Sequence, residues 1–225
     1  AYHILHGVDL AVPKGQLTML LGRNGAGKTT TLRTIMGLWH ASKGSIHFGG
    51  KDITAMNTPA IAGMNIAYVP ENMGIFADLT VKENMLLAAR SARNAAQMDE
   101  ARLQWIFKLF PAVEKFWNHP AGKLSGGQKQ MVAVSRAIVE PRDLLIVDEP
   151  SKGLAPAIIN NMIDAFDQLK RSGVTILLVE QNINFAKRLG DTVAVMDNGQ
   201  VVHAGSMAAL AQDEELQRSL LGLAL

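Results

Sequence analysis

Short, largely apolar runs divide this chain at intervals. They cover residues 17–21, 66–69, 144–147 and 174–179, and each is followed by glycine, proline or polar side chains. A short apolar run without polar alternation is typical of a strand covered on both faces of a parallel sheet. These four segments therefore predict the buried centre of a sheet.

Three other places show the weaker pattern of partly exposed strands. Residues 4–12 alternate loosely, and residues 45–48 lie between glycines. The segments 192–196 and 200–203 flank Asp197-Asn198-Gly199, a sequence typical of a tight hairpin turn. We therefore predict additional strands at 4–12 and 45–48, and a hairpin near the C-terminal end.

The segments between these strands carry helical spacing and helix caps. Thr80 with Glu83 and Ser125 with Gln128 each fit a capping box. The predicted helices are 29–36, 80–89, 99–110 (ended by a proline at position 111), 125–139, 159–169, 183–189 and the segment from 206 onward. Alternating strands and helices of this kind place the chain in the α/β class with a parallel sheet.

Residues 76–140 differ from the rest of the chain. Glycine is scarce in most of this segment, and no part of it has a convincing strand pattern. We interpret it as a helical insertion in an α/β core formed by residues 1–75 and 141–225. A length of 225 residues suits one large domain, so 1–225 is treated as a single domain with an inserted subdomain.

The composition excludes several kinds of chemistry. Cysteine is absent, which rules out disulfides and thiol catalysis. The chain has 22 basic and 20 acidic residues with no basic block, so we expect no nucleic-acid partner. No apolar run approaches the roughly 18 residues that span a bilayer, so a membrane role would come through a partner.

The first apolar run leads into Gly22-Arg23-Asn24-Gly25-Ala26-Gly27-Lys28-Thr29, which fits the phosphate-binding loop G-x-x-x-x-G-K-[ST]. Glycines let backbone N–H groups converge on an anion, and the following helix directs its positive N-terminus at phosphate. Lys28 brings a charge to the β- and γ-phosphates, and the Thr29 hydroxyl can ligate Mg²⁺. The expected nucleotide contacts are Gly22, Asn24, Gly25, Ala26, Gly27, Lys28, Thr29 and Thr30.

Two acidic residues, Asp148 and Glu149, follow the apolar run 144–147. Ligands of open α/β sheets bind at the carboxyl ends of the strands, so both side chains should point toward the phosphate site. Asp148 suits Mg²⁺, directly or through water, and Glu149 is placed to polarise a water for attack on the γ-phosphate.

Residues Ser125, Gly126, Gly127 and Gln128 predict a second helix start that can bind an anion. Two glycines remove side chains from its first turn and expose backbone N–H groups, although no lysine accompanies them. One nucleotide needs only one full phosphate cradle. We therefore expect this second helix start to serve the nucleotide of another subunit.

The phosphate loop, the run LSGGQ at 124–128 and the run LLIVDEP at 144–150, in this order, resemble the ATP-binding subunits of ABC transporters. The resemblance covers essentially the whole chain. It implies a P-loop NTPase fold, with a RecA-like parallel sheet core and an antiparallel β subdomain, that uses ATP and Mg²⁺. It also implies a head-to-tail dimer, in which Ser125 and Gly127 contact the γ-phosphate of the opposite subunit and residues 151–156 cross the interface.

The resemblance further implies a set of partners. These are a second ABC ATPase subunit in a homo- or heterodimer, integral membrane permease subunits and, indirectly, a periplasmic solute-binding protein. The expected location is the cytoplasmic face of the inner membrane, as a peripheral subunit.

Two positions depart from the usual family pattern at the catalytic site. Glu71 stands where the family usually has Gln, and Gln181 stands where it usually has His. The resemblance carries both into the predicted catalytic set with Glu149. It also carries Glu71 into the predicted Mg²⁺ set with Thr29 and Asp148.

A third departure concerns the base of the nucleotide. The family stacks adenine on an aromatic residue upstream of the phosphate loop, but Tyr2 lies too close to Lys28 to serve. Because the chain begins inside a predicted strand, we expect this aromatic residue in a missing N-terminal piece.

The departures point to one branch of the family. Tyr-Val-Pro-Glu at 68–71, the run at 76–84 and Val-Glu-Gln-Asn at 179–182 resemble ATPases of high-affinity branched-chain amino acid importers. Importers of urea and other polar solutes are close relatives, so both solute classes stay open. Non-transport ABC ATPases usually carry long coiled-coil inserts or tandem domains, which this chain lacks, and Glu149 disfavours a binding module with little turnover.

Overall fold

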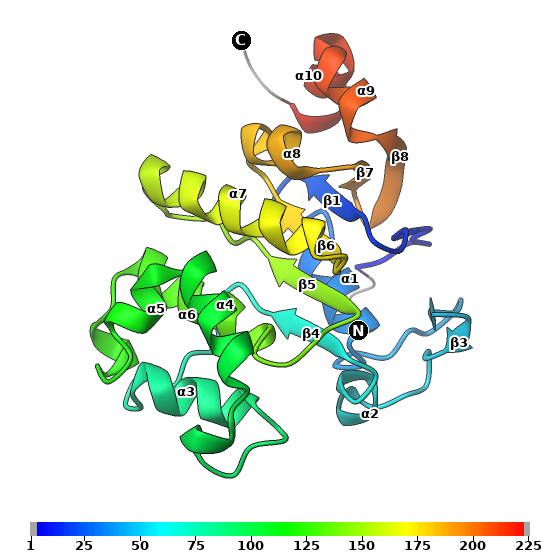
Figure 1. The fold of residues 1–225 in the computed structure, drawn as a ribbon. Helices are drawn as coiled ribbons and strands as arrows, with labels where there is room; N and C mark the ends of the chain where they lie inside the picture. The colour runs from blue at the N-terminus through cyan, green and yellow to red at the C-terminus, as the bar shows by residue number, and fades with distance from the viewer. Residues whose placement is uncertain (1–3, 223–225) are drawn as a thin grey trace.

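A twisted sheet with helices on both faces forms the centre of the computed structural model, which describes residues 4–222 (Figure 1). Its six strands lie in the order β4-β5-β6-β1-β7-β8. The first five are parallel, and β8 runs antiparallel to β7. The strands are β1 (Leu17–Gly22), β4 (Ile66–Val69), β5 (Leu144–Asp148), β6 (Thr175–Glu180), β7 (Thr192–Asp197) and β8 (Gln200–Ser206). The predicted α/β class with a parallel core sheet is confirmed.

The strand order brings three loops to one edge of the sheet. β1 pairs with β6 so that Leu21 lies opposite Glu180, and β5 pairs with β6 so that Asp148 lies opposite Val179. Because these strands are parallel, the loops that follow them emerge side by side. The phosphate loop, the acidic pair and the Gln181 loop are therefore neighbours.

Each face of the sheet is buried by its own set of helices. One apolar cluster holds Leu20 of β1 with Leu32 and Ile61, from α1 (Lys28–Ile35) and α2 (Thr58–Ala62). The other holds Met19 with Phe166 and the helices α7 (Pro156–Arg171), α8 (Ile183–Leu189), α9 (Met207–Gln212) and α10 (Glu214–Leu221). In residues 4–222 no helix is long and apolar enough to cross a membrane.

The named elements between β4 and β5 are all helical, as the pattern predicts. They are α3 (Val81–Ala88), η1 (Ala95–Gln97), α4 (Glu100–Leu109), α5 (Pro111–Lys115), η2 (Ala121–Lys123) and α6 (Gly126–Ala137). Both predicted capping boxes form at α3 and α6. The boundaries of a helical subdomain at 76 and 140 stay a prediction.

The expectation that Pro111 only ends a helix is incomplete. Phe110 closes α4, and Pro111 then opens the short helix α5 as its first residue. Proline is well suited to that position, because the first N–H groups of a helix have no partner within it.

The strand predicted at residues 4–12 is wrong. Gly7 has a φ of +86°, which breaks the extended backbone, and the N–H of His6 donates to the Gly199 carbonyl at 2.8 Å without a continuing ladder. The alternating apolar side chains still pack on the core; they are Leu5, Val8, Leu10 and Val12. Tyr2 lies outside the described residues.

The strand predicted at 45–48 forms only in its second half, as one arm of a short hairpin. β2 (His47–Phe48) pairs antiparallel with β3 (Lys51–Asp52), which has no apolar signal and was not predicted. Gly49 and Gly50 between them have φ of 56° and 81°, which suits a tight two-residue turn. The predicted antiparallel β subdomain therefore appears as this two-stranded sheet.

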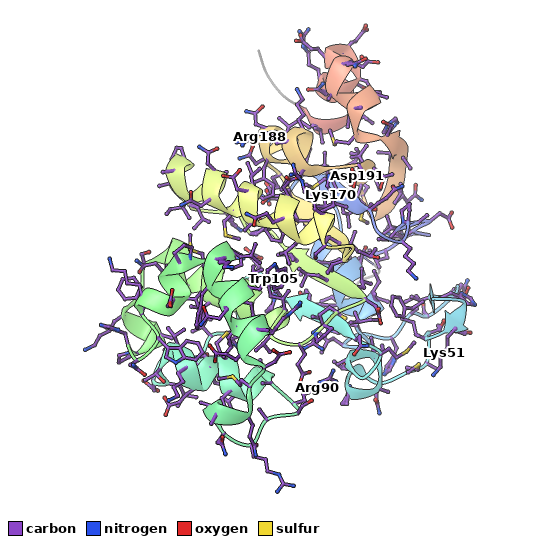
Figure 2. The ribbon with its side chains drawn as sticks, viewed as in Figure 1. Lys51, Arg90, Trp105, Lys170, Arg188 and Asp191 are labelled. Carbon is purple, nitrogen blue, oxygen red and sulfur yellow. The ribbon has the colours of Figure 1, made fainter. Side chains whose placement is uncertain are left out.

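A partly buried polar contact lies at the opposite end of the strands, where β1 and β7 begin (Figure 2). Asp191 accepts a hydrogen bond from the backbone N–H of Leu17 at 2.8 Å, and Lys170 donates to the same carboxylate at 3.1 Å. This contact ties the start of β1 to Asp191, at the end of the strand that is far from the phosphate loop.

Candidate functional site

The phosphate loop follows β1 in a backbone form that requires glycine. Gly27 has a φ of +104° and precedes α1 without any side-chain cap, so the first N–H groups of the helix are left for a ligand. A Cβ on Gly22 would lie 2.4 Å from the Met196 carbonyl oxygen of β7. Thr29 and Thr30 occupy the first turn of α1, as predicted.

Lys28 lies inside this loop, with 5% of its surface exposed. Its ammonium donates to the carbonyls of Gly22 at 2.8 Å and Arg23 at 3.1 Å, and it lies 3.7 Å from Glu149. Burial lowers the pKa of Lys28, while the charges of Glu149 and Asp148 oppose that shift. The carbonyl contacts hold the ammonium where phosphate oxygens can replace them.

Glu149 and Gln181 meet the phosphate loop directly. The side-chain amide of Gln181 donates to Glu149 Oε1 at 2.7 Å and to Asn24 Oδ1 at 2.7 Å. Glu149 has a φ of 47°, an uncommon backbone form for a non-glycine residue. Three residues that are far apart in the sequence and were predicted from separate motifs thus form one hydrogen-bonded group.

Asp148, at the end of β5, is 1% exposed, and neither of its carboxylate oxygens has a hydrogen-bond partner. Burial raises its pKa, and a contact with the Thr29 hydroxyl opposes that shift. A buried carboxylate without a partner is costly, and a bound cation would supply one. No group of three or more His, Cys, Asp or Glu suited to a metal occurs in residues 4–222, so phosphate and water oxygens would have to complete the shell.

Glu71 is held by a residue that the sequence patterns did not single out. Lys152 donates to the Glu71 carboxylate and lies 3.6 Å from Glu149. The charge of Glu71 contributes to the raised pKa of Asp148, but burial is the larger cause. The structure therefore brings Glu71 into the acidic group through Lys152. One sequence feature could have pointed to this contact, because Lys152 follows Glu149 by three residues.

Two further residues of the site were not predicted. Glu180, which precedes Gln181, is 2% exposed and accepts three backbone N–H groups. The Tyr68 hydroxyl of β4 is buried without a hydrogen-bond partner; burial and the nearby charge of Asp148 raise its pKa to about 12. Glu180 ends β6 and Tyr68 lies one residue before the end of β4, where side-chain surroundings depend on the strand order.

The residues of the second glycine-rich helix start lie apart from this group. Ser125 accepts from the N–H of Gln128 at 3.3 Å, and Gln128 accepts from the N–H of Ser125 at 2.9 Å. Within the part of the chain that the structure describes, no hydrogen bond or ion pair joins these residues to the phosphate loop. Gly127 is packed against Ile158 of α7, whereas a Cβ on Gly126 would meet open space.

Comparison with known proteins identifies this arrangement. Residues 5–152 match the family model described as ABC transporter. The high-affinity branched-chain amino acid transport ATP-binding protein BraG of Pseudomonas aeruginosa is 39% identical over 97% of this chain and 93% of its own length. A probable branched-chain amino acid transport ATP-binding protein, LivF, of Archaeoglobus fulgidus is 34% identical over 98% of this chain and 93% of its own.

Solved structures show the same fold. A nucleotide-free ATP-binding cassette from an ABC transporter superposes with a TM-score of 0.78 at 27% identity, covering 98% of this chain and 89% of that one. A cassette in its ADP conformation superposes with a TM-score of 0.77 at 28% identity, covering 97% and 89%. The predicted P-loop NTPase fold is confirmed. Taken with the family match and the full-length relatives, these likenesses show that the chain belongs to the ABC transporter family, as its nucleotide-binding, ATP-hydrolysing cassette.

Proposed function

We propose that this chain powers an importer for branched-chain amino acids or closely related solutes. The observation that carries the proposal is its identity of 39% and 34%, over nearly all of the chain, with two proteins named for branched-chain amino acid transport. Glu71 and Gln181, the two departures from the usual family pattern, support the same branch.

ATP would bind with its phosphates on the free N–H groups of α1. Lys28 would exchange the carbonyls of Gly22 and Arg23 for phosphate oxygens, and it would keep its charge near Glu149. Glu149 would accept a proton from the attacking water, and the amide of Gln181 would donate to the γ-phosphate. Their present hydrogen bond holds both groups at the same place.

The residues at the end of β5 suit Mg²⁺. Thr29 and Asp148 would hold the ion, because the Asp148 oxygens are buried without partners beside the Thr29 hydroxyl. Glu71 would join them, directly or through water, after leaving Lys152. When bound, Mg²⁺ neutralises charge on the β- and γ-phosphate oxygens.

A second subunit would complete the site. Ser125 and Gly126 of the Ser125–Gln128 helix start are exposed. Among residues 4–222, this helix start makes no hydrogen bond to the phosphate loop of the same chain. We propose that two cassettes pack head to tail, so that this helix start closes over the partner's ATP.

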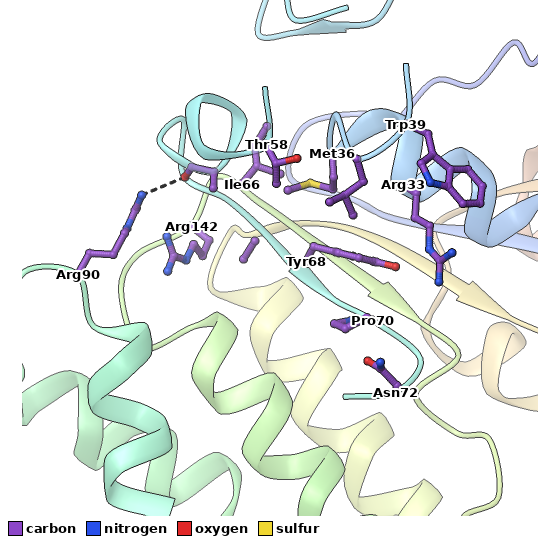
Figure 3. Close-up of a pocket in the computed structure, with 13 residues that line it drawn as sticks. Arg33, Met36, Trp39, Thr58, Ile66, Tyr68, Pro70, Asn72, Arg90 and Arg142 are labelled. Carbon is purple, nitrogen blue, oxygen red and sulfur yellow. Dashed lines mark hydrogen bonds between the residues drawn. The ribbon is translucent and has the colours of Figure 1, made fainter. Parts of the chain in front are cut away.

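The permease would dock in a cleft of about 740 Å³ beside β4 (Figure 3). Leu38 and Trp39 stand at the cleft with 49% and 43% of their surfaces exposed, which suits an apolar helix face. Three arginines line it; they are Arg33, Arg90 and Arg142.

The positive charge of the cleft favours binding of an apolar permease helix that carries acidic side chains. Arg90 and Arg142 both pair with the single carboxylate of Glu140, so the cleft keeps an excess of positive charge. Tyr68 lines the same cleft and reaches toward Asp148, which gives a docked helix a short path to the Mg²⁺ residues.

The test is ATP-dependent uptake in proteoliposomes that hold this chain with its permeases and solute-binding protein. Leucine, isoleucine or valine should accumulate, and Glu149→Gln should abolish the uptake. Arg33→Glu should weaken co-purification with the permease while leaving ATP binding intact. Accumulation of urea alone, with none of the three amino acids, would contradict the proposed solute.

A further inference from the structure

Glu180, the last residue of β6, is a buried acid without a role in the scheme above. One carboxylate oxygen accepts from the N–H of Ser151 at 2.9 Å. The other accepts from the N–H groups of Gln181 at 3.1 Å and Asn182 at 3.3 Å. The residue is 2% exposed, so water can contribute little to these contacts.

These three bonds join two loops of the site. Ser151 belongs to the loop that follows β5 and carries Glu149, whereas Gln181 and Asn182 begin the loop that follows β6. The backbone N–H of Glu149 already donates to the Val179 carbonyl at 3.0 Å, and the Glu180 side chain extends this link to Ser151, Gln181 and Asn182. The bond of 2.7 Å from Gln181 to Glu149 joins the same two loops.

Only a carboxylate can make this pattern of contacts. It offers two acceptor oxygens and no donor, whereas a glutamine would turn its NH₂ group toward one of the N–H donors. Burial raises the pKa of Glu180, and the backbone donors oppose that shift. An apolar residue would fill the same space without this desolvation cost, so packing alone does not explain the acid.

We infer that Glu180 is a positioning residue for ATP hydrolysis, which holds the Glu149 loop and Gln181 in register with each other. The inference rests on the roles proposed above for Glu149 and Gln181. It assigns to Glu180 no contact with ATP, water or Mg²⁺.

The first test is Glu180→Gln. The kcat for ATP should fall by about 10- to 100-fold, the scale of a lost supporting contact or a small misplacement of reacting groups. The Kd for ATP should change by less than about threefold, because the phosphate loop is untouched. Asp191→Asn is the matched control, since that carboxylate accepts the Leu17 N–H at the opposite end of the strands. It should lower the Tm and leave kcat unchanged.

A double-mutant cycle separates positioning from general damage. If Glu180 acts through Gln181, the pair Glu180→Gln and Gln181→Ala should be no slower than the slower single variant. Rate losses that multiply in the double variant would overturn the inference, as would an unchanged kcat in a folded Glu180→Gln protein.

Hydrogen exchange on the unaltered protein gives a test that needs no variant. The amides of Ser151 and Gln181 should exchange at least about 100-fold more slowly than free loop amides, since both donate to a buried acceptor. Exchange at the free rate would overturn the inference. Protected amides in a protein that shows no ATPase activity would confirm the Glu180 contacts but contradict the proposed function.

Discussion

Two helix starts in this chain carry glycine-rich loops, and they are built in opposite ways. α1 follows Gly27 with no side-chain cap, and its Lys28 is buried. α6 follows Ser125 with a complete capping box, and Ser125 itself is exposed. One helix start leaves its N–H groups without a side-chain cap, beside a buried lysine, whereas the other satisfies part of its N–H groups at the surface.

The difference supports the proposal that one chain builds only half of a nucleotide site. Asn24 in the loop before α1 accepts from Gln181 of the same chain, which also donates to Glu149. The start of α6 has no such support in the part of the chain described, and Gly126 faces open space. The proposal therefore assigns phosphate binding within the chain to the loop before α1, and contact with a partner subunit's nucleotide to the start of α6.

The largest expected loss of ATP hydrolysis comes from a substitution at the start of α6. Ser125→Arg should abolish ATP hydrolysis, because a bulky cation would occupy the place proposed for the partner's γ-phosphate. ATP binding to the dilute monomer, measured by titration calorimetry, should change by less than about threefold. Lys28→Ala is the opposite control and should weaken that binding by about 10- to 100-fold. A large loss of affinity in the Ser125 variant would place the signature in its own chain's site.

Glu149→Gln tests whether the two halves meet. Loss of the general base should lower turnover by about 10²- to 10⁴-fold while ATP still binds. Because hydrolysis would reopen the dimer, ATP should then trap a dimer that is visible by size-exclusion chromatography. Turnover close to that of the unaltered protein would remove Glu149 from the proposed role.

Gln181→Ala should cause a smaller loss of ATP turnover than Glu149→Gln. Loss of its donor should reduce turnover by roughly one to three orders of magnitude. Gln181→His should stay active and add a pH dependence between about 5.5 and 7.5, where histidine titrates and gains a charge as the pH falls. Steady-state rates across that range on the assembled complex measure both. A Gln181→Ala variant as fast as the parent would assign the γ-phosphate donor elsewhere.

The smallest effect separates packing from ligand contact in the signature. A Cβ on Gly127 would lie 2.6 Å from Cγ2 of Ile158, a stiff branched side chain, so Gly127→Ala should cost about 1–3 kcal/mol in the free energy of unfolding. Gly126→Ala should not lower that free energy, since no atom lies within 4 Å of the added carbon. Urea unfolding of both variants is the measurement. Equal losses would show that Gly127 has no special packing role.

Sequence patterns predicted more of the site than of the surrounding surface elements. The buried strands, the phosphate loop and the acidic pair were all predicted, because apolar runs and glycine spacing express local requirements. The strand at 4–12 was wrong because Gly7 breaks it, and β3 was missed because Lys51–Asp52 carries no apolar signal. Such short edge elements depend on neighbours more than on their own residues.

The sequence by itself determined the buried strands of the sheet, the two capping boxes and the candidate residues for phosphate and Mg²⁺. Only the tertiary structure decided which of those residues touch. Gln181 reaches Asn24 and Glu149 because β6 lies between β5 and β1, and Lys152 reaches Glu71 because β4 lies beside β5. Helix caps and periodicity act within a few residues, whereas strand order joins residues more than a hundred positions apart. The partners of a side chain at a strand end are therefore set by the sheet and not by its sequence neighbours.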